Sequence, residues 1–383
     1  MAINPLVHRM RGFGTTIFAE MSALAVSTGS INLGQGFPDT DGPAQVLQAA
    51  ARAITDGGHN QYPPGAGLPE LRRAIAEHQR RFYHLDFDPD AEVLVTAGAT
   101  EAIAAALLAL CDVDDEVVLF EPYYDSYAAC IALAGATRRT VTLRRDEQRW
   151  VFDPAELRAK INRRTRLILL NTPHNPTGKV FDATELQLIA DLAIEHDLTV
   201  VTDEVYEHLV FDGSHVPLAT LPEMRQRTVT ISSAGKTFSV TGWKIGWVCA
   251  PPVLTSAVRT VKQFLTYVNG GPFQPAVALG LGLSDEYFAR SAQGLREQRD
   301  VLCDGLADAG FDVVRPQATY FATVDVRRNG VDFCRSLPST HGVVAIPSSV
   351  FYDSSAGQDY VRFAFCKRPE VLAEAIIRLK GAG

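Results

Sequence analysis

The sequence lacks closely spaced cysteines and long apolar runs. No two of its six cysteines form a CxxC pair, which argues against a disulfide framework or a structural zinc site and favours buried thiols in a reducing cytoplasm. The most apolar stretch, residues 102–111, has about half the length that spans a bilayer, so we expect a buried helix there. We therefore expect neither a bound metal nor a membrane-spanning segment.

Basic clusters, repeats and low-complexity tracts are also missing. The formal charge is −8 and the Lys and Arg residues are scattered, so neither nucleic acid nor an anionic membrane is an expected partner. Residues 1–14 carry Arg9 and Arg11 but not the apolar core of a signal peptide, and we expect a cytoplasmic protein. With 383 residues, of which 46 % are hydrophobic, the chain can fill roughly two or three globular domains.

Apolar segments typical of strands alternate with helical patterns through the middle of the chain. We predict strands at residues 92–96, 116–120, 167–171, 198–202, 228–232 and 244–250, and helices at 100–110, 127–134, 183–196 and 253–267. Several of these strands are apolar on both faces, as in a sheet that is covered by helices. The alternation predicts an α/β domain with a largely parallel sheet.

The pattern changes near residues 272–275. A helical stretch at 276–309, broken near 284–285, precedes strand-like segments at 321–326, 343–346 and 361–365 and a last helix at 370–379. This order predicts a smaller α+β unit. The first ~40 residues contain several Gly and Pro, and we expect them to form an arm and a loop rather than a domain.

A lysine follows the predicted strand at 228–232, in the segment Ser-Ser-Ala-Gly-Lys-Thr-Phe. Its Gly-Lys-Thr invites comparison with a nucleotide-binding P-loop, but Thr230 stands where that motif needs its first glycine. A partly desolvated lysine amine can instead form a Schiff base with the aldehyde of a cofactor. Lys236 is therefore the candidate catalytic residue, although a lone lysine is most often a solvated charge and the hypothesis needs partner residues.

Candidate partners end two other predicted strands. Asn171-Thr-Pro-His-Asn-Pro-Thr-Gly178 follows one of them, at the end where open α/β sheets bind ligands, and Asn175 could direct its amide at a ring substituent. A local turn hydrogen bond would also account for this asparagine. In Thr202-Asp-Glu-Val-Tyr206, a buried Asp203 needs a cation such as a protonated pyridine nitrogen, and Tyr206 could donate to a phenolic oxygen. A helix cap is the alternative role for Asp203.

A phosphate could bind at Gly98-Ala-Thr-Glu101, which joins a predicted strand to the helix that follows. Free N–H groups and the dipole at a helix start suit an anion, although such turns are common. Ser233 and Lys244 could add a hydroxyl and a positive charge. Tyr124 could stack on a planar ring, whereas Tyr123 fits an aromatic core equally well.

Arg362 lies in a predicted strand of alternating apolar residues, Asp359-Tyr-Val-Arg-Phe-Ala-Phe365. An arginine in such a strand needs a carboxylate partner, because a buried unpaired charge is costly. The α-carboxylate of a substrate in bidentate geometry would serve, and so would an internal salt bridge.

In this order, the motifs resemble those of the class I/II aminotransferases, enzymes of fold type I that depend on pyridoxal 5′-phosphate (PLP). The similarity extends over nearly the whole chain and includes Thr-Gly-Trp-Lys-Ile-Gly-Trp, Asn32-Leu-Gly-Gln-Gly-Phe-Pro38 and Asn60-Gln-Tyr62. It implies an α/β large domain with a mostly parallel seven-stranded sheet flanked by helices at residues 46–275, and a smaller α+β domain at 276–383. Residues 1–45 would be the N-terminal arm and a segment of the small domain.

The resemblance also implies roles for single residues. Lys236 would bind PLP covalently, Asp203 would pair with the ring nitrogen, and Asn175 and Tyr206 would bond the phenolic oxygen. Lys236, Asp203 and Tyr206 are thus the expected catalytic residues, and Tyr124 would stack on the ring.

The phosphate of PLP would lie on the backbone of Ala99, Thr100 and Glu101, with Ser233 and Lys244 beside it. Lys244 stands where many members of the class have Arg, but it matches the branch that this chain most resembles.

The substrate and the partner subunit would meet a further set of residues. Arg362, the Gly36 N–H and Asn175 would hold the substrate, and Phe18 falls where relatives place an aromatic side chain in the substrate pocket. Tyr62 would reach the phosphate of the neighbouring subunit, which implies a homodimer with shared active sites.

The implied reaction moves an amino group between an amino acid and a 2-oxo acid, with glutamate and 2-oxoglutarate as the expected couple. The branch resembles the kynurenine/glutamine/methionine aminotransferases, and residues 18–25 and 272–278 are most similar to the actinobacterial N-succinyldiaminopimelate aminotransferases of lysine biosynthesis. A succinylated diaminopimelate would need a distal cation, for which Lys262 and residues 263–271 are candidates.

Other substrates and roles stay open at this point. An aromatic donor would favour Phe18, Tyr123 and Tyr267, and β-elimination from cysteine conjugates is possible on the same scaffold. A PLP-sensing module of a transcription regulator would carry a basic DNA-binding domain, whereas this arm is short and the chain is acidic.

Overall fold

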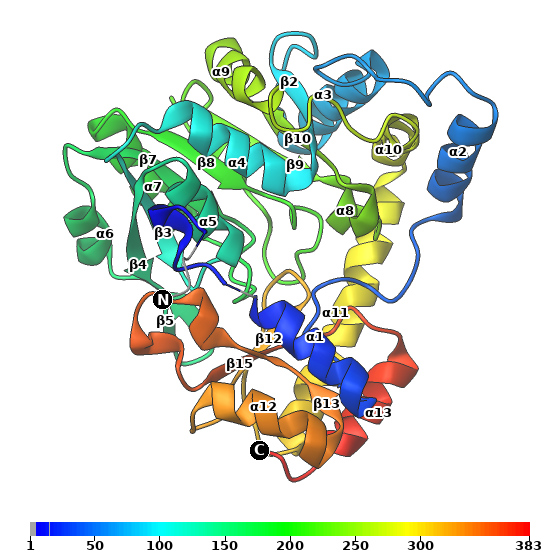
Figure 1. Ribbon diagram of the computed structural model, residues 1–383, viewed down its shortest axis with the longest axis vertical. Helices are drawn as coiled ribbons and strands as arrows, with labels where there is room; N and C mark the ends of the chain where they lie inside the picture. Colours follow the sequence, from blue (N-terminus) through cyan, green and yellow to red (C-terminus); the bar gives the residue numbers. More distant parts are fainter. Residues whose placement is uncertain (1–4, 15) are drawn as a thin grey trace.

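The computed structural model describes residues 5–14 and 16–383, so residues 1–4 and 15 of the predicted arm lie outside the described residues. A seven-stranded sheet with the order β2-β10-β9-β8-β7-β3-β4 crosses the upper part of the molecule (Figure 1). Only β10 is antiparallel to its neighbours in this sheet. The predicted α/β fold with a mostly parallel seven-stranded sheet is confirmed. The strands are β2 (Val93–Ala97), β3 (Glu116–Glu121), β4 (Thr137–Thr142), β7 (Thr165–Asn171), β8 (Thr199–Asp203), β9 (Thr228–Ser233) and β10 (Ile245–Cys249).

Helices cover both faces of this sheet. Leu167 and Leu169 of β7 face the core under α4 (Gly98–Leu110), α5 (Asp125–Leu133) and α9 (Pro252–Lys262). Ile168 and Leu170 face the opposite core, under α6 (Pro154–Lys160) and α7 (Ala183–Glu195). Because successive strand side chains point to opposite faces, this double burial explains why the strands are apolar throughout. At the β2–β10 edge the sheet packs against α3 (Pro69–Tyr83) and α10 (Phe273–Leu281), and α2 (Ala44–Thr55) packs on α10.

The C-terminal part contains a four-stranded sheet with the order β11-β12-β15-β14. The long helix α11 (Asp285–Asp308) reaches it from the larger part, and α12 and α13 pack beside it (Figure 1). The prediction of a smaller α+β unit here agrees with these elements, while the exact domain bounds remain a prediction. The other elements are β11 (Asp312–Val314), β12 (Phe321–Asp325), β13 (Val343–Val344), β14 (Ile346–Pro347), β15 (Tyr360–Ala364), α12 (Gly330–His341) and α13 (Pro369–Leu379).

The N-terminal segment is more ordered than predicted. Helix α1 (Ile17–Thr28) and strand β1 (Ile31–Asn32) pack against the C-terminal part, where β1 pairs in parallel with β13. This packing goes beyond the arm and loop expected from composition, and it agrees with the small-domain segment that the resemblance implies within residues 1–45. Met21 and Ala25 of α1 are buried in a core made mainly by residues more than 270 positions later, a contact that local sequence patterns cannot indicate.

Other elements also differ from prediction. The helix predicted at 253–267 ends earlier, at Lys262, and strand β4 was not predicted. β4 is an edge strand that carries Arg138 and Arg139, so it lacks the apolar pattern of its neighbours. A hairpin of β5 (Arg144–Asp146) and β6 (Arg149–Val151) follows it. Among the described residues, no helix is both long and apolar enough to cross a membrane.

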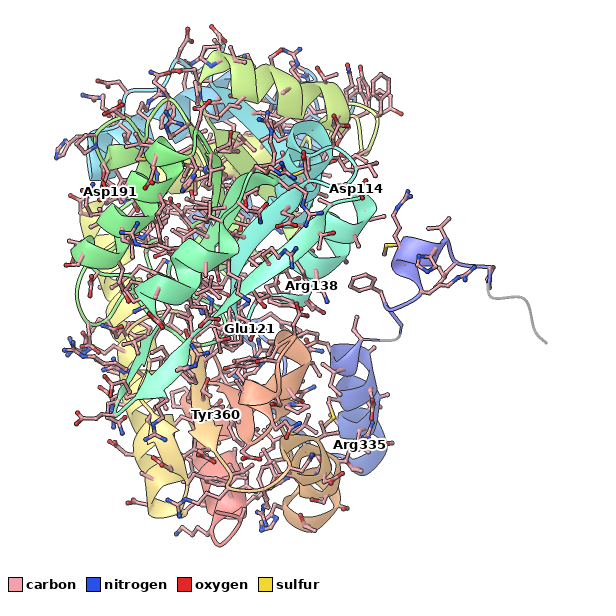
Figure 2. All side chains as sticks on the ribbon, turned by 90° about the vertical axis from the view of Figure 1, so that its left-hand side faces the viewer. Asp114, Glu121, Arg138, Asp191, Arg335 and Tyr360 are labelled. Atoms are coloured by element: carbon pink, nitrogen blue, oxygen red, sulfur yellow. The ribbon has the colours of Figure 1, made fainter. Side chains whose placement is uncertain are left out.

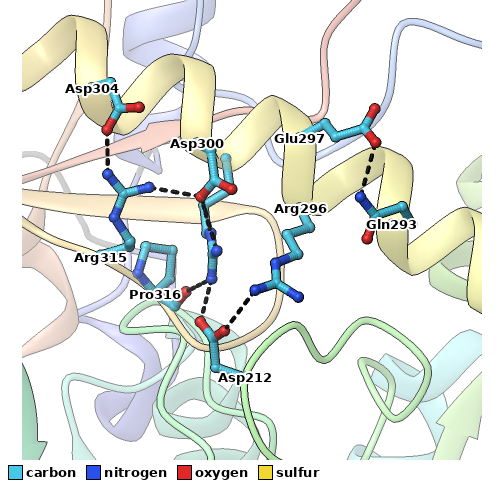
Figure 3. A network of polar contacts seen from close by, with 9 residues as sticks. Asp212, Gln293, Arg296, Glu297, Asp300, Asp304, Arg315 and Pro316 are labelled. Carbon is cyan, nitrogen blue, oxygen red and sulfur yellow. Dashed lines mark hydrogen bonds and ion pairs between the residues drawn. The ribbon is translucent and has the colours of Figure 1, made fainter.

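Polar contacts join the two parts of the molecule. Arg138 of β4 donates to both carboxylate oxygens of Asp353, and Glu121 at the end of β3 accepts from the Asp353 N–H at 2.7 Å. Figure 2 shows Glu121 and Arg138 near each other where the large sheet approaches the C-terminal segments. On the other side of the junction, α11 carries a network of Arg and Asp side chains that reaches Asp212 and Pro316 (Figure 3).

Candidate active site

A cavity of about 450 Å³ lies at the carboxyl ends of three parallel strands. β7 ends at Asn171, β8 at Asp203 and β9 at Ser233, and all three residues line it. This is the edge of an open α/β sheet where ligands bind. The cavity brings together all the predicted site residues except Tyr62 and Glu101, namely Phe18, Gly36, Ala99, Thr100, Tyr124, Asn175, Asp203, Tyr206, Ser233, Lys236, Lys244 and Arg362.

Asp203 is a buried carboxylate whose strongest contact was not predicted. The Tyr127 hydroxyl donates to Asp203 Oδ2 at 2.6 Å, and the Val205 N–H donates to Oδ1 at 3.3 Å. Burial raises the pKa of Asp203 to about 6, against the lowering effect of these hydrogen bonds. A cationic group of a ligand next to Asp203 would lower the pKa of this carboxyl again. Asp203 is therefore suited to pair with a protonated pyridine nitrogen.

Lys236 lies in the short helix α8 (Ala234–Thr237), directly after β9. Its Nζ donates to the Tyr320 hydroxyl at 2.7 Å, and the Tyr320 hydroxyl donates to the Gly36 carbonyl at 2.6 Å. Burial lowers the pKa of Lys236 to about 8, which increases the neutral, nucleophilic fraction of the amine near neutral pH. The lysine thus faces the same cavity as Asp203 and fits an aldehyde-binding role better than a P-loop.

The start of α4 forms a cradle for an anion. Gly98 has a φ of +73°, and a Cβ on it would lie 3.1 Å from Lys244 Nζ. A Cβ on Gly246 would lie 2.7 Å from the Ala99 nitrogen, so both positions need glycine. Lys244 therefore places its charge beside the free N–H groups of the helix start, which suits a phosphate.

The side chain of Glu101 does not line the cavity, unlike Ala99 and Thr100 of the same turn. Its carboxylate accepts from the Ala97 N–H at 2.6 Å and from the Thr266 hydroxyl at 2.5 Å. The side chain therefore closes the start of α4 instead of lining the cavity, and a phosphate contact by its backbone remains a prediction.

Arg362 is buried without a carboxylate partner. Its guanidinium donates to Asn175 Oδ1 at 3.2 Å and to the Gly34 carbonyl at 3.0 Å, and it lies 3.9 Å from the ring of Phe321 and 5.3 Å from that of Phe18. Its Nε has no hydrogen-bond partner, and among the described residues it forms no ion pair. Burial lowers its pKa to about 10, so it is still charged at neutral pH. The internal salt bridge considered from the sequence is absent from the described residues, and a substrate carboxylate fits the vacant donor.

Tyr123 and Tyr124, which are adjacent in the Glu-Pro-Tyr-Tyr-Asp segment, lie in different environments. Tyr124 lines the cavity, with its ring edge-on to that of Tyr127 at 5.6 Å. Tyr123 is buried in the core, and its hydroxyl donates to Asp353 at 2.7 Å. The core interpretation therefore applies to Tyr123.

Two candidates from the sequence lie away from the cavity. Tyr62 is 81 % exposed and contacts the ring of Tyr267. Lys262 is 1 % exposed, and its Nζ donates to the carbonyls of Gly65 and Tyr267 at 3.3 and 2.6 Å. Lys262 therefore holds two loops and does not line the cavity of its own chain, and its contact with a distal carboxylate remains a prediction.

Sequence reasoning missed Tyr127 and Tyr320. Tyr127 lies three positions after Tyr124 in α5, so helical spacing could have placed both on one face. No comparable signal exists for Tyr320, whose contact with Lys236 joins residues 84 positions apart.

Comparisons with known proteins agree with this geometry. The family model for class I and II aminotransferases matches residues 28–379. The chain is 54 % identical to a probable N-succinyldiaminopimelate aminotransferase, DapC, of Mycobacterium tuberculosis, over 97 % of each chain, and 39 % identical to a methionine aminotransferase of Escherichia coli, over 99 % and 100 %. The solved N-succinyldiaminopimelate aminotransferase of M. tuberculosis superposes with a TM-score of 0.96 at 52 % identity, over 99 % of this chain and 100 % of the other.

Relatives of this identity over the full length establish the family. The cavity fits PLP as well, because it combines a cradle for a phosphate, a buried carboxylate for a pyridinium and a lysine for an aldehyde. The chain belongs to the class I and II aminotransferases of PLP fold type I, and it is a PLP-dependent enzyme that transfers an amino group between an amino acid and a 2-oxo acid.

Proposed function

We propose that this aminotransferase takes the amino group of N-succinyl-LL-2,6-diaminopimelate and passes it to 2-oxoglutarate, a step of lysine biosynthesis. The transfer reaction itself is supported most directly by Arg362, a buried guanidinium with a free donor that lines the same cavity as the Lys236 amine. The choice of donor is supported by the 54 % identity to the M. tuberculosis enzyme that is named for this substrate.

The residues around the cavity have separate roles in this proposal. When bound, PLP supplies an aldehyde that accepts the amino group and a ring that takes up the electrons of the substrate Cα–H bond. Asp203 would hold a negative charge against the ring nitrogen, and the hydrogen bond from Tyr127 favours the ionised form of that carboxylate. Asn175 and Tyr206 would bond the phenolic oxygen, and Tyr124 would pack on the ring.

The phosphate is held at the start of α4. The free N–H groups at the start of this helix, from Ala99, Thr100 and Glu101, would bind it, and Ser233 and Lys244 would add a hydroxyl and a charge. Lys244 lies next to Gly98, so this charge is in place before the anion arrives.

Lys236 moves the proton of the reaction. Its Nζ would take the proton from the donor Cα as a neutral amine and, in the second half-reaction, would deliver a proton to the Cα of the acceptor as an ammonium, so the amine must be neutral for the first of these steps. The lowered pKa of about 8 makes a substantial neutral fraction available near pH 7.5. Arg362 fixes the substrate α-carboxylate, which orients the Cα–H bond toward Nζ.

The distal carboxylates of the proposed amino donor favour a homodimer. The cations that line the cavity among the described residues are Lys236, Lys244 and Arg362, and each has a role already. We infer that the distal carboxylates of the donor meet residues of a partner subunit, in a dimer that Tyr62 helps to complete. The six unpaired cysteines accord with a cytoplasmic enzyme.

The donor assignment can be tested with a panel of amino donors, with 2-oxoglutarate as acceptor. We expect kcat/KM for N-succinyl-LL-2,6-diaminopimelate to exceed that for methionine, kynurenine and glutamine by at least about 100-fold, because charged distal groups are discriminated strongly. A higher value for one of the other donors would refute the donor assignment and leave the aminotransferase reaction intact. Release of pyruvate and ammonia from cysteine conjugates without an acceptor would reveal β-lyase activity.

A further inference from the structure

A second group of ionisable side chains lies behind the active site. Asp203 and Tyr206 line the cavity, whereas Glu204, Glu207 and His208 of the same segment do not. Glu207 and His208 meet His78 of α3, a helix that packs on the β2–β10 edge of the sheet. The segment that carries two predicted PLP-binding residues therefore has a polar face that the aminotransferase reaction does not use.

Three side chains of this group converge on one point. One ring nitrogen of each histidine and a carboxylate oxygen of Glu207 all lie within 4.8 Å of one another, and the two Nε2 atoms are 2.6 Å apart. Two imidazoles and one carboxylate form a common ligand set for zinc.

The group also has an unused polar atom, although it is buried. His78 is 2 % exposed and Glu207 5 %, yet Glu207 Oε2 has no hydrogen-bond partner among the described residues. A buried carboxylate oxygen without a partner costs free energy, and an ion bound at this oxygen would satisfy it.

Neighbouring contacts already orient the carboxylates. The Ser232 hydroxyl donates to Glu207 Oε1 at 2.5 Å, and His215 Nε2 lies 2.8 Å from Glu204 Oε2. Such outer contacts fix the ligands of metal sites in position.

The charges of the neighbouring side chains also favour a bound cation. Glu207 is buried, whereas Glu204 already lies against His215 and the guanidinium of Arg81 is paired with Asp285. A buried carboxylate is costly without a positive partner, and a cation at Glu207 would supply that charge.

We propose that His78, Glu207 and His208 form a binding site for one divalent transition-metal ion of the zinc or cobalt type, separate from the PLP site. Tetrahedral bonds of about 2.05 Å require the two Nε2 atoms to move apart to about 3.3 Å. His208 lies in a turn and is only partly buried, so it can make this movement and provides the entry path. The ion would tie α3 to the segment of Asp203 and Tyr206.

The proposal can be tested with Co²⁺, whose d–d bands lie at longer wavelength than the absorption of bound PLP. The PLP-loaded enzyme is treated with a chelator, dialysed and titrated with Co²⁺, and bound metal is counted by mass spectrometry. We expect one Co²⁺ per chain with tetrahedral d–d bands, and a loss of affinity of at least about 100-fold in His208→Gln and in Glu207→Gln.

His84→Asn is the matched control, because His84 is exposed and lies six positions after His78 at the end of the same helix. It should bind Co²⁺ as the unsubstituted enzyme does. Thermal unfolding gives a second measurement, since Zn²⁺ should raise the midpoint of the enzyme and of His84→Asn but not that of His208→Gln. Absence of the d–d bands in the unsubstituted enzyme, or equal Co²⁺ affinity in all variants, would overturn the site and leave His78 and His208 as a hydrogen-bonded pair.

Discussion

At the scale of single residues, Tyr127 controls a catalytic group although it belongs to none of the sequence motifs. Its hydroxyl donates to Asp203 Oδ2 at 2.6 Å, and this bond favours the ionised carboxylate. Burial acts in the opposite direction and raises the pKa of Asp203 to about 6. The balance between these two effects decides at which pH Asp203 loses its charge.

Tyr127→Phe removes the donor and should raise the pKa of Asp203. Because a protonated Asp203 cannot hold a charge against the ring nitrogen, activity should then fall at a higher pH than in the unsubstituted enzyme. We expect the acid limb of the pH profile of kcat/KM to move up by about one unit. Tyr123→Phe is the control, since that hydroxyl donates to Asp353 and not to Asp203. An unmoved acid limb in Tyr127→Phe would contradict this role.

Arg362→Lys tests how the substrate carboxylate is held. The substitution keeps the charge but removes the planar pair of donors, so kcat/KM should fall by about 30- to 150-fold, the equivalent of about 2–3 kcal/mol. The measurement is steady-state kinetics for both the donor and 2-oxoglutarate, since the same arginine should serve each. Arg335→Lys, on the exposed side of α12, should change neither (Figure 2). A loss for only one of the two substrates would show that the other carboxylate binds elsewhere.

At the scale of elements, α11 holds the two parts of the molecule together through a buried arginine. Arg299 has a side chain that is 4 % exposed, and it bonds Asp212, Asp300 and the Pro316 carbonyl (Figure 3). Arg296, one turn earlier, reaches the same Asp212 at 3.5 Å but is 46 % exposed. The two residues share a helix, a charge and a partner, and differ mainly in burial.

Arg299→Ala should therefore lower the free energy of unfolding by about 3 kcal/mol, because it leaves a cavity and an unpaired buried carbonyl. Arg296→Ala should lower it by less than about 1 kcal/mol, as is usual for exposed ion pairs. Urea unfolding of both variants at one protein concentration measures the difference. Equal losses in the two variants would mean that burial does not set the strength of this network.

The elements that could be predicted from sequence are those whose pattern is local. β7 and β8 are apolar runs that end in polar motifs, so the strands and the residues Asn175 and Asp203 could be found together. α1 and β4 could not, because α1 is stabilised by a distant core and β4 is a charged edge strand. The cluster of His78, Glu207 and His208 was not predicted either, since these side chains come together from up to 130 positions apart.

At the scale of the whole molecule, the active site is assembled from segments that are far apart in the chain. Phe18 and Gly36 come from the N-terminal segment, Asp203 from the large sheet, Lys236 from the short helix α8 that follows β9, and Arg362 from the small sheet. Tyr62 is the one predicted PLP contact that is largely exposed and remote from this cavity. Exposed aromatic side chains gather near it, since Tyr267 contacts its ring and Phe264 is 82 % exposed. Such a surface is typical of a subunit interface.

If Tyr62 serves the PLP site of the partner, two defective variants should complement each other. Lys236→Ala inactivates its own site, and Tyr62→Phe should weaken PLP binding by about 10- to 100-fold through the loss of one bond to a charged group.

In a mixed dimer, the subunit with an intact Lys236 would receive an intact Tyr62 from its partner. After subunit exchange in an equal mixture at limiting PLP, activity should rise to about a quarter of that of the unsubstituted enzyme, because half of the dimers are mixed and each holds one complete site. Activity that stays at the mean of the two separate variants would mean that Tyr62 acts within its own chain or away from the cofactor. The pair Lys236→Ala and Tyr123→Phe gives the baseline for exchange without complementation, because Tyr123 is buried within its own subunit.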